Sequence, residues 1–368
     1  MKNLLTCLIL FAALPMNHPG VWKSPDPLPV APAENLFIIT IDGFRWQELF
    51  TGADESLLAD TTCTPDPAMM KMMYWDEKPE ERRKKLLPFF WNIIGSQGCL
   101  YGNRNYNNKV NTANLFRFSY PGYNEIFTGN TDIMVSSNKK RKNSNVNVLE
   151  YLHGREGFKD KVVAFTSWDV FPYILNKERN GLLINSGYEC IDKTDCEAQR
   201  MISQVQTEAV YHKGQTRYDQ LTFLTAKEYV QQHKPRVVYI GLGETDEYAH
   251  SGRYDLYLDQ ANKIDRMLAE LWLWVQTTPG YRNNTTFLIT TDHGRGSRDR
   301  KWTSHGAFIK GSSQTWLALI GPGIQAVGEM KENQQFYQEQ IANTIAALVG
   351  ETFDRRSAAG DLATGNHR

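Results

Sequence analysis

The sequence lacks an excess of charge of either sign. Lysine and arginine total 41 residues, aspartate and glutamate also total 41, and the formal net charge at pH 7 is therefore zero. Proteins that bind nucleic acid or acidic lipid through charge carry a basic surplus. The basic runs Arg82–Lys85 and Lys139–Lys142 are short, and we interpret both as solvated surface. We expect no nucleic-acid-binding surface, and a small molecule as the substrate.

Cysteine is also scarce, with five residues in the chain, and none of them has zinc-finger spacing. Thiolate is therefore not the expected metal ligand. Cys190 and Cys196 bracket a polar loop and could close a small disulfide ring. A bridge between Cys63 and Cys99 would follow by elimination only, and free buried thiols are an almost equally good interpretation of that pair.

The apolar run at the N-terminus, Leu4 to Leu14, is too short to cross a bilayer. It follows Lys2 and precedes a proline-rich stretch, which is typical of a signal peptide. We therefore expect residues 1–33 to be a signal peptide and linker, cleaved between Ala13 and Ala33, and the protein to be exported to the periplasm or secreted. Residues 34–368 are expected to form a single domain without a transmembrane segment. The alternative is an apolar tail on a cytosolic protein, and no feature predicts the oligomeric state.

Short, nearly continuous hydrophobic runs alternate with helical patterns along the rest of the chain. Such runs are typical of strands that are covered on both faces, so the pattern predicts an α/β fold whose central sheet is mostly parallel, with helices on both faces. The expected strands are Leu36–Ile41, Lys161–Thr166, Val237–Leu242, Phe287–Thr291 and Trp316–Ile320, and the expected helices are Phe89–Ser96, Asp195–Tyr211, Gln220–His233, Tyr254–Thr277 and Gln335–Val349.

Residues 51–88 are expected to form an inserted cap or helical excursion. The methionines at positions 69, 70, 72 and 73 are interpreted as core filling.

Three acidic residues lie directly after or close behind expected strands. Asp42 follows LFIITI, Asp292 follows FLITT, and Asp246 lies just beyond VVYIGLGET. Ligands of open α/β sheets bind beyond the carboxyl ends of the strands, where these three side chains should converge. Because converging carboxylates repel one another, cations are expected among them.

Three of the eight histidines accompany these acids. His250 lies four residues after Asp246, on the same face of a helical turn; His293 follows Asp292 directly, and His305 lies in the loop beyond. Six nitrogen and oxygen ligands favour Zn²⁺, with Mn²⁺ as the alternative. The natural partition assigns Asp246, His250 and His305 to one ion and Asp42, Asp292 and His293 to the other. Three protein ligands for each ion leave a coordination position open, as in catalytic sites.

The segments IDGFR, ETDEYAH, TTDHG and SHG occur in this order and resemble the metal-ligand signatures of the alkaline phosphatase superfamily. The nucleotide pyrophosphatase/phosphodiesterase branch is the most similar. The resemblance spans Asp42 to His305 and implies an alkaline-phosphatase-like fold with two divalent metal ions.

The resemblance also implies a nucleophile and a donor to the phosphoryl group. Ser119, in RFSYPGYNEIFTG, matches the position of the family's nucleophile and would also ligate the first ion, whereas Thr128 is a competing hydroxyl that we interpret as structural. The family places an asparagine some twenty residues after the nucleophile to donate to a phosphoryl oxygen. Asn138 is the candidate, and Asn143 is its rival.

Two departures from the family pattern affect the expected substrate. Phosphodiesterase relatives have Thr-x-Pro-Asn at the nucleophile, whereas this chain has Ser-Tyr-Pro-Gly. Tyr123 occupies the position of the arginine in the sulfatase frame, which disfavours a sulfatase. The expected activity is hydrolysis of a phosphoric monoester or diester through a phosphoseryl intermediate. The alternatives are a sulfate or phosphonate hydrolase, a phosphoglycerate-mutase-like enzyme and a catalytically silent relative that binds a metal or a phosphorylated ligand.

Four basic residues near the metal motifs could contact substrate charge: Arg45, Arg295, Arg298 and Lys301. For each of them a surface or structural salt bridge is the favoured interpretation.

Overall fold

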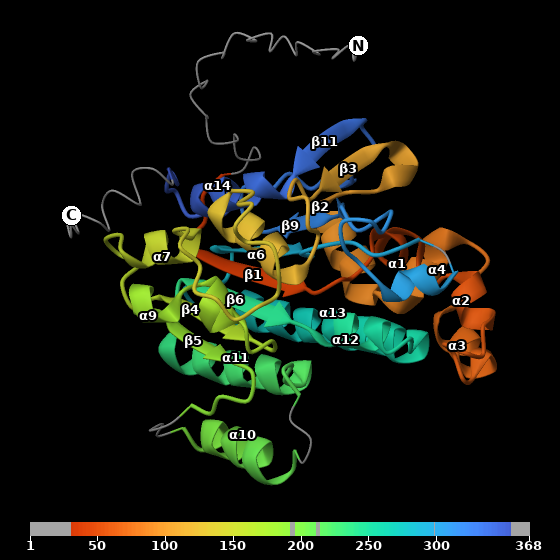
Figure 1. Ribbon diagram of the computed structural model, residues 1–368. Helices are drawn as coiled ribbons and strands as arrows, with labels where there is room; N and C mark the ends of the chain where they lie inside the picture. The colour runs from red at the N-terminus through yellow and green to blue at the C-terminus, as the bar shows by residue number, and fades with distance from the viewer. Residues whose placement is uncertain (1–30, 192–195, 211–213, 298, 355–368) are drawn as a thin grey trace, which may run out of the picture.

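Strand β1 (Asn35–Ile41) lies at the centre of an eight-stranded sheet. This is seen in the computed structural model, which describes residues 31–191, 196–210, 214–297 and 299–354 (Figure 1). The strand order is β10-β2-β9-β7-β1-β6-β4-β5. The other strands of this sheet are β2 (Gly98–Tyr101), β4 (Val162–Thr166), β5 (Leu183–Ser186), β6 (Val237–Leu242), β7 (Thr285–Thr290), β9 (Leu317–Ile320) and β10 (Gly328–Glu329). Only β9 runs antiparallel to its neighbours, so the predicted mostly parallel sheet is confirmed.

Both faces of the sheet are covered, which explains why β1 is a continuous hydrophobic run rather than an alternating one. Phe37, Ile39 and Ile41 point into one core and Leu36 and Ile38 into the other, because successive side chains of a strand point to opposite faces. The first core is completed by the helices α11 (Asp219–His233) and α13 (Tyr254–Thr277). The second is completed by α6 (Ser119–Thr128), α7 (Val148–His153) and α14 (Ile341–Ala347), on the other side of β1 in Figure 1.

The remaining elements are a second small sheet and a set of shorter helices and turns. A second, three-stranded sheet contains β3 (Asn108–Asn111), β8 (Gln314–Thr315) and β11 (Gln334–Tyr337). The other helices are α1 (Trp46–Thr51), α5 (Gly95–Gln97), α8 (Phe171–Ile174), α9 (Lys177–Asn180), α10 (Glu197–Glu208), α12 (Glu244–His250) and the π-helix η1 (Phe90–Ile94), with 3-10 turns η2 (Arg104–Tyr106), η3 (Asp299–Thr303) and η4 (Gln338–Gln340). The helix expected over Gln335–Val349 is therefore wrong in its first third. There Gln334–Tyr337 pairs in parallel with β3, because pairing between distant segments overrides local helical pattern.

The expected excursion over residues 51–88 is helical. It contains α2 (Glu55–Ala59), α3 (Pro67–Tyr74) and α4 (Pro79–Leu86), which pack on one another, on α1 and on α13. The interpretation of its methionines as core filling is correct only for Met70. Met69, Met72 and Met73 are exposed, since α3 is a surface helix that buries one narrow face.

Among the described residues, none of Cys63, Cys99, Cys190 and Cys196 forms a disulfide. The suggested Cys190–Cys196 ring is thus wrong in this structure. The Cys190 sulfur lies 3.8 Å from Thr207 Oγ1, facing the end of α10, whereas Cys196 lies at the start of that helix. Residues 1–30, which include most of the expected signal peptide and linker, lie outside the described residues. Of the last residues of that expected segment, Ala33 donates its N–H to Leu348 O at 2.7 Å. Within the described residues, no helix is long and apolar enough to cross a membrane.

Candidate metal centre

The three neighbouring central strands β7, β1 and β6 end at the same edge of the sheet and carry the acidic residues there. Asp42 follows β1, Asp292 follows β7 by one residue, and Asp246 lies in α12, which begins two residues after β6. Gly43 makes the turn after β1 with φ +60°, and a Cβ at this position would lie 2.7 Å from Arg295 Nη1 and from Asp246 Oδ1. Only glycine fits there, because both the backbone conformation and the space exclude a side chain.

Asp42, Asp292 and His293 form the first group of potential ligands, which is fully buried. His293 Nε2 lies 3.5 Å from Asp42 Oδ1 and 3.4 Å from Asp292 Oδ2. Ser119 Oγ approaches the same nitrogen at 3.2 Å. Among the described residues, Asp42 Oδ1 and Asp292 Oδ2 have no hydrogen-bond partner, although both are buried. Buried oxygens without a donor are costly, so this group has the character of a cation site.

Asp246, His250 and His305 form the second group, which lies at the surface end of the site. The α-helical spacing of four residues places His250 Nε2 3.1 Å from Asp246 Oδ2. His305 Nε2 lies 3.1 Å from His250 Nε2, and its ring stacks on that of His293 with centroids 3.8 Å apart. Asp246 Oδ1 is 3.9 Å from the Nε2 atoms of both His293 and His305, so the two groups adjoin.

The backbone fixes which nitrogen of two imidazoles faces the carboxylates. His293 Nδ1 lies 3.1 Å from Gly294 O, and His305 Nδ1 lies 3.0 Å from Arg117 O. A carbonyl oxygen only accepts, so both Nδ1 atoms donate, and the neutral rings present unprotonated Nε2 atoms to the acids. This second interaction of the ring is typical of metal-ligating histidines.

The electrostatics of the cluster fit the same interpretation. Burial, together with Asp292 and Asp246, raises the pKa of Asp42 well above its ordinary value. Burial raises the pKa of Asp292 to about 7, with Asp246 adding to the shift. Burial lowers the pKa of His305 to about 4 and that of His293 well below its usual range. The acids repel one another and the imidazoles of His293 and His305 are neutral, so a cation in the first group would supply the positive charge that Asp42 and Asp292 lack.

Ser119 is placed beside the first group by helix α6, of which it is the first residue. Gly122, one turn later, allows the helix to touch the end of β7, since a Cβ there would lie 2.5 Å from Asp292 O. The competing hydroxyl of Thr128 donates to Asn124 O at 2.7 Å inside α6 and faces away from the acids. The structure thus brings Ser119, and not Thr128, to the six potential ligands.

The asparagine candidates differ sharply in their contacts. Asn138 is exposed and accepts the Tyr120 N–H at 3.0 Å through Oδ1, directly beside Ser119, and its Nδ2 has no hydrogen-bond partner among the described residues. Asn143 is buried, donates to Asn124 Oδ1 at 2.9 Å and accepts the N–H of Asn145. Asn143 is therefore a structural residue, and Asn138 is the one near the nucleophile.

Two residues of the site were not assigned to it by sequence reasoning. Tyr123 donates its hydroxyl to Asp42 Oδ2 at 3.0 Å from the second turn of α6. Arg295 forms a buried ion pair with Asp246. A salt bridge was the favoured interpretation of this residue, but its partner was not predicted. Tyr123 could have been found from the sequence, because it lies four residues after Ser119 and therefore on the same face of a helix. Arg45 pairs with buried Glu48 as a structural residue, and the side chain of Arg298 lies outside the described residues.

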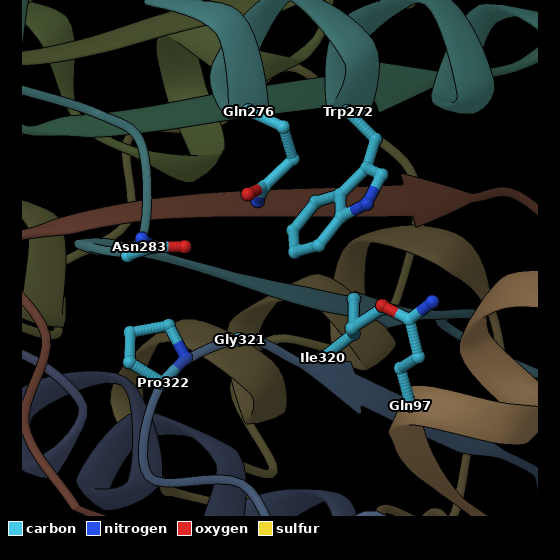
Figure 2. A pocket seen from close by; sticks show the side chains of 7 residues that line it. All are labelled: Gln97, Trp272, Gln276, Asn283, Ile320, Gly321 and Pro322. Atoms are coloured by element: carbon cyan, nitrogen blue, oxygen red, sulfur yellow. The ribbon is translucent and has the colours of Figure 1, made fainter. Parts of the chain in front are cut away.

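A separate hollow of about 200 Å³ lies away from this edge of the sheet (Figure 2). Trp272 and Gln276 of α13 point into it from one side, opposite Pro322 and Gln97. Its wall includes Ile320, which pairs with Phe287 in the first half of β7, whereas Asp292 follows the other end of that strand. No titratable side chain lines it, so it offers no chemistry of the kind seen at the strand ends.

Comparison with known proteins agrees with this geometry. A family model described as the Metalloenzyme superfamily matches residues 195–309, which include five of the six potential ligands, all but Asp42. No curated protein matches the sequence.

Several solved structures share the fold at low sequence identity. The alkaline phosphatase PafA is 11% identical, with a TM-score of 0.57 over 87% of this chain and 96% of its own. A phosphonate monoester hydrolase of Agrobacterium radiobacter is 11% identical, with a TM-score of 0.51 over 87% of this chain and 78% of its own. The lipoteichoic acid synthase LtaP from Listeria monocytogenes is 12% identical, with a TM-score of 0.51 over 88% of this chain and 73% of its own.

The chain therefore has the fold of the alkaline phosphatase superfamily, and the resemblance inferred from its motifs is confirmed at this level. Its placement in the nucleotide pyrophosphatase/phosphodiesterase branch stays a prediction.

Proposed function

We propose that the protein is a two-metal hydrolase of phosphoric esters in which Ser119 is the nucleophile. The observation that carries the proposal is the convergence of Ser119 Oγ, His293 Nε2 and the unpartnered oxygens of Asp42 and Asp292 at one buried point. A hydroxyl in a cation site of this kind is the arrangement that an activated serine nucleophile needs.

Asp42, Asp292, His293 and Ser119 would hold the first ion, and Asp246, His250 and His305 the second. Zn²⁺ suits a set of nitrogen and oxygen donors without thiolate, and Mn²⁺ is the alternative. When bound, two divalent ions lower the pKa of a nucleophilic hydroxyl and stabilise negative charge on the phosphoryl oxygens.

Ser119 Oγ would form a bond to phosphorus as the ester oxygen leaves, which gives a phosphoseryl intermediate and releases the alcohol. A water oxygen then bonds to phosphorus as the Ser119 Oγ–P bond breaks, which releases the phosphate and regenerates the Ser119 hydroxyl. Tyr123 orients Asp42 through its hydrogen bond, and Asn138 would donate from Nδ2 to a non-bridging oxygen. In the ion-free chain the Ser119 hydroxyl donates to His293 Nε2, since Nδ1 of that ring carries the proton.

A single panel of substrates tests the proposal and separates its alternatives. Hydrolysis of p-nitrophenyl phosphate, its bis-ester, p-nitrophenyl sulfate and a phenylphosphonate ester is compared with Zn²⁺ and then with Mn²⁺. We expect a phosphate ester to have the highest kcat/KM, because Tyr123 replaces the arginine of the sulfatase frame. A higher value for the sulfate or the phosphonate would reverse the assignment, and no turnover of any ester would favour a binding protein.

The covalent step is tested by Ser119→Ala. Removing the nucleophile should lower kcat by at least about 10³-fold while the metal content stays close to that of the wild type. Thr128→Ala is the matched control, because that hydroxyl only bonds within α6. Unchanged activity in Ser119→Ala would refute the phosphoseryl mechanism.

We further propose that the protein is exported and that its signal peptide is cleaved between Ala13 and Ala33. The supporting features are Lys2 and the short apolar run that follows it. Mass spectrometry of the protein recovered outside the cytoplasm should show an N-terminus between residues 14 and 34. Recovery of the intact chain from the cytoplasm would contradict this.

A further inference from the structure

The two groups of potential ligands differ in the charge that the protein itself supplies. The first group contains two carboxylates, and among the described residues neither Asp42 nor Asp292 forms an ion pair with a lysine or arginine. The second group contains one carboxylate, Asp246, which already pairs with Arg295. The first group therefore offers a cation two carboxylates without a basic partner, whereas the single carboxylate of the second group is already paired with a guanidinium.

Arg295 is held in place and remains charged. Its side chain is buried, Nε donates to Trp302 O at 2.8 Å, and Nη2 donates to Thr303 O at 2.6 Å. A guanidinium does not lose its proton in proteins, so its charge is permanent.

The two groups also differ in how far hydrogen bonds from the protein satisfy their ligand atoms, and again the first group has fewer partners. The unpartnered buried oxygens of the cluster, Asp42 Oδ1 and Asp292 Oδ2, both belong to the first group. In the second group His250 Nδ1 lies 3.4 Å from Arg295 Nη2, a donor, while His250 Nε2 contacts Asp246 Oδ2. The second group is thus largely satisfied by protein contacts, and His250 is exposed to solvent.

We propose that Arg295 is a resident counter-charge that makes the two ion sites unequal. The site at Asp42, Asp292 and His293 fills first and holds its ion tightly. The site at Asp246, His250 and His305 fills second and exchanges its ion with the solvent, because an incoming dication meets a fixed positive charge there. The inference rests on the two-metal site proposed above, and it makes turnover dependent on the free concentration of the second ion.

The experiment is calorimetric titration of Zn²⁺ into the metal-stripped full-length protein, without substrate. We expect two steps whose Kd values differ by at least about 100-fold, because a unit charge at contact distance changes affinity by this order. After gel filtration in metal-free buffer, one ion per chain should remain. Asp42→Asn should remove the tight step, and His250→Ala should remove the weak one. Two equal steps in the wild type, or loss of the weak step in Asp42→Asn, would overturn the proposal.

The role of Arg295 itself is tested with Arg295→Met and the charge-conserving Arg295→Lys. Loss of the charge should tighten the weak step by about 10- to 100-fold and leave the tight step within about threefold, whereas the lysine variant should keep a weak second step. An unchanged second step in a folded Arg295→Met variant would refute the role of the arginine. If that variant does not fold, the wild-type titration and the Asp42 and His250 variants still decide whether the sites are unequal. None of these readouts uses hydrolysis, so failure of this proposal is distinguishable from failure of the proposed activity.

Discussion

Gly122 offers the sharpest test of how tightly the nucleophile is positioned. It lies one turn after Ser119 in α6, and an added Cβ would lie 2.5 Å from Asp292 O and 3.1 Å from the carbonyl carbon. An ordinary contact of carbon with a carbonyl oxygen is about 3.3 Å, so Gly122→Ala must move α6 or the end of β7 by roughly 0.8 Å. Both segments carry proposed catalytic groups, and neither can yield without changing the distance between Ser119 and Asp292.

We expect Gly122→Ala to lower kcat/KM for p-nitrophenyl phosphate by about 10- to 100-fold, because a misplacement near 1 Å costs about 10²-fold. Overpacking should also lower the free energy of unfolding by about 1–3 kcal/mol. The assay combines initial rates at saturating Zn²⁺ with urea unfolding. Gly214→Ala is the control, because the nearest atom to its added Cβ, Thr216 N, is 4.0 Å away. A folded Gly122→Ala variant with kcat/KM within about twofold of the wild type would refute the argument that this close approach positions the nucleophile.

Three further predictions follow from single contacts. Asn138→Asp keeps the oxygen that accepts the Tyr120 N–H but removes the Nδ2 donor, so kcat/KM should fall by about 10²-fold with little change in stability. An unchanged kcat/KM would exclude Asn138 as a hydrogen-bond donor to the phosphoryl group. Burial raises the pKa of Asp265 to about 7, although its carboxylate accepts the N–H groups of Phe89 and Phe90, so the stability that this group contributes is greatest below pH 4 and is lost as the pH rises toward 7. Asp265→Asn should reduce this loss in urea unfolding midpoints measured from pH 4 to 8. Parallel curves for the variant and the wild type would contradict the prediction. Chelation of the ions should lower the melting temperature, since Asp42 and Asp292 lose their counter-charge, and added Zn²⁺ should restore it; a melting temperature insensitive to chelator would contradict a metal site in the folded chain.

The central strands could be predicted because burial on both faces leaves an unambiguous hydrophobic run, as in Val237–Leu242. The positions of the acids then follow from topology, since the carboxyl ends of neighbouring parallel strands share one edge. The second sheet could not be predicted in the same way. Its strand β11, QQFY, is polar and largely exposed, and only its pairing with Asn108–Asn111 makes it extended.

Within the site, the sequence indicates residues next to strand ends and family motifs, but not which side chains reach in from elsewhere. Tyr123 and Arg295 lie beside predicted site residues in the chain, yet their contacts with Asp42 and Asp246 depend on the packing of α6 and of the 3-10 turn η3, which contains Trp302. The same limit applies to the asparagines, since Asn138 and Asn143 differ only in what surrounds them.

The central position of β1 has a consequence for synthesis of the protein. Strand β1 pairs with β6 and β7, and the partner of Leu36 is Val237 while that of Asn35 is Thr285, so both partners are synthesised long after β1. A ribosome completes about 200 to 250 residues between these partners, during which an apolar segment has no neighbour in its sheet. Folding dominated by such distant pairings is slow and leaves nascent chains prone to aggregation. Chains truncated before Thr285 should therefore require a chaperone to stay dispersed.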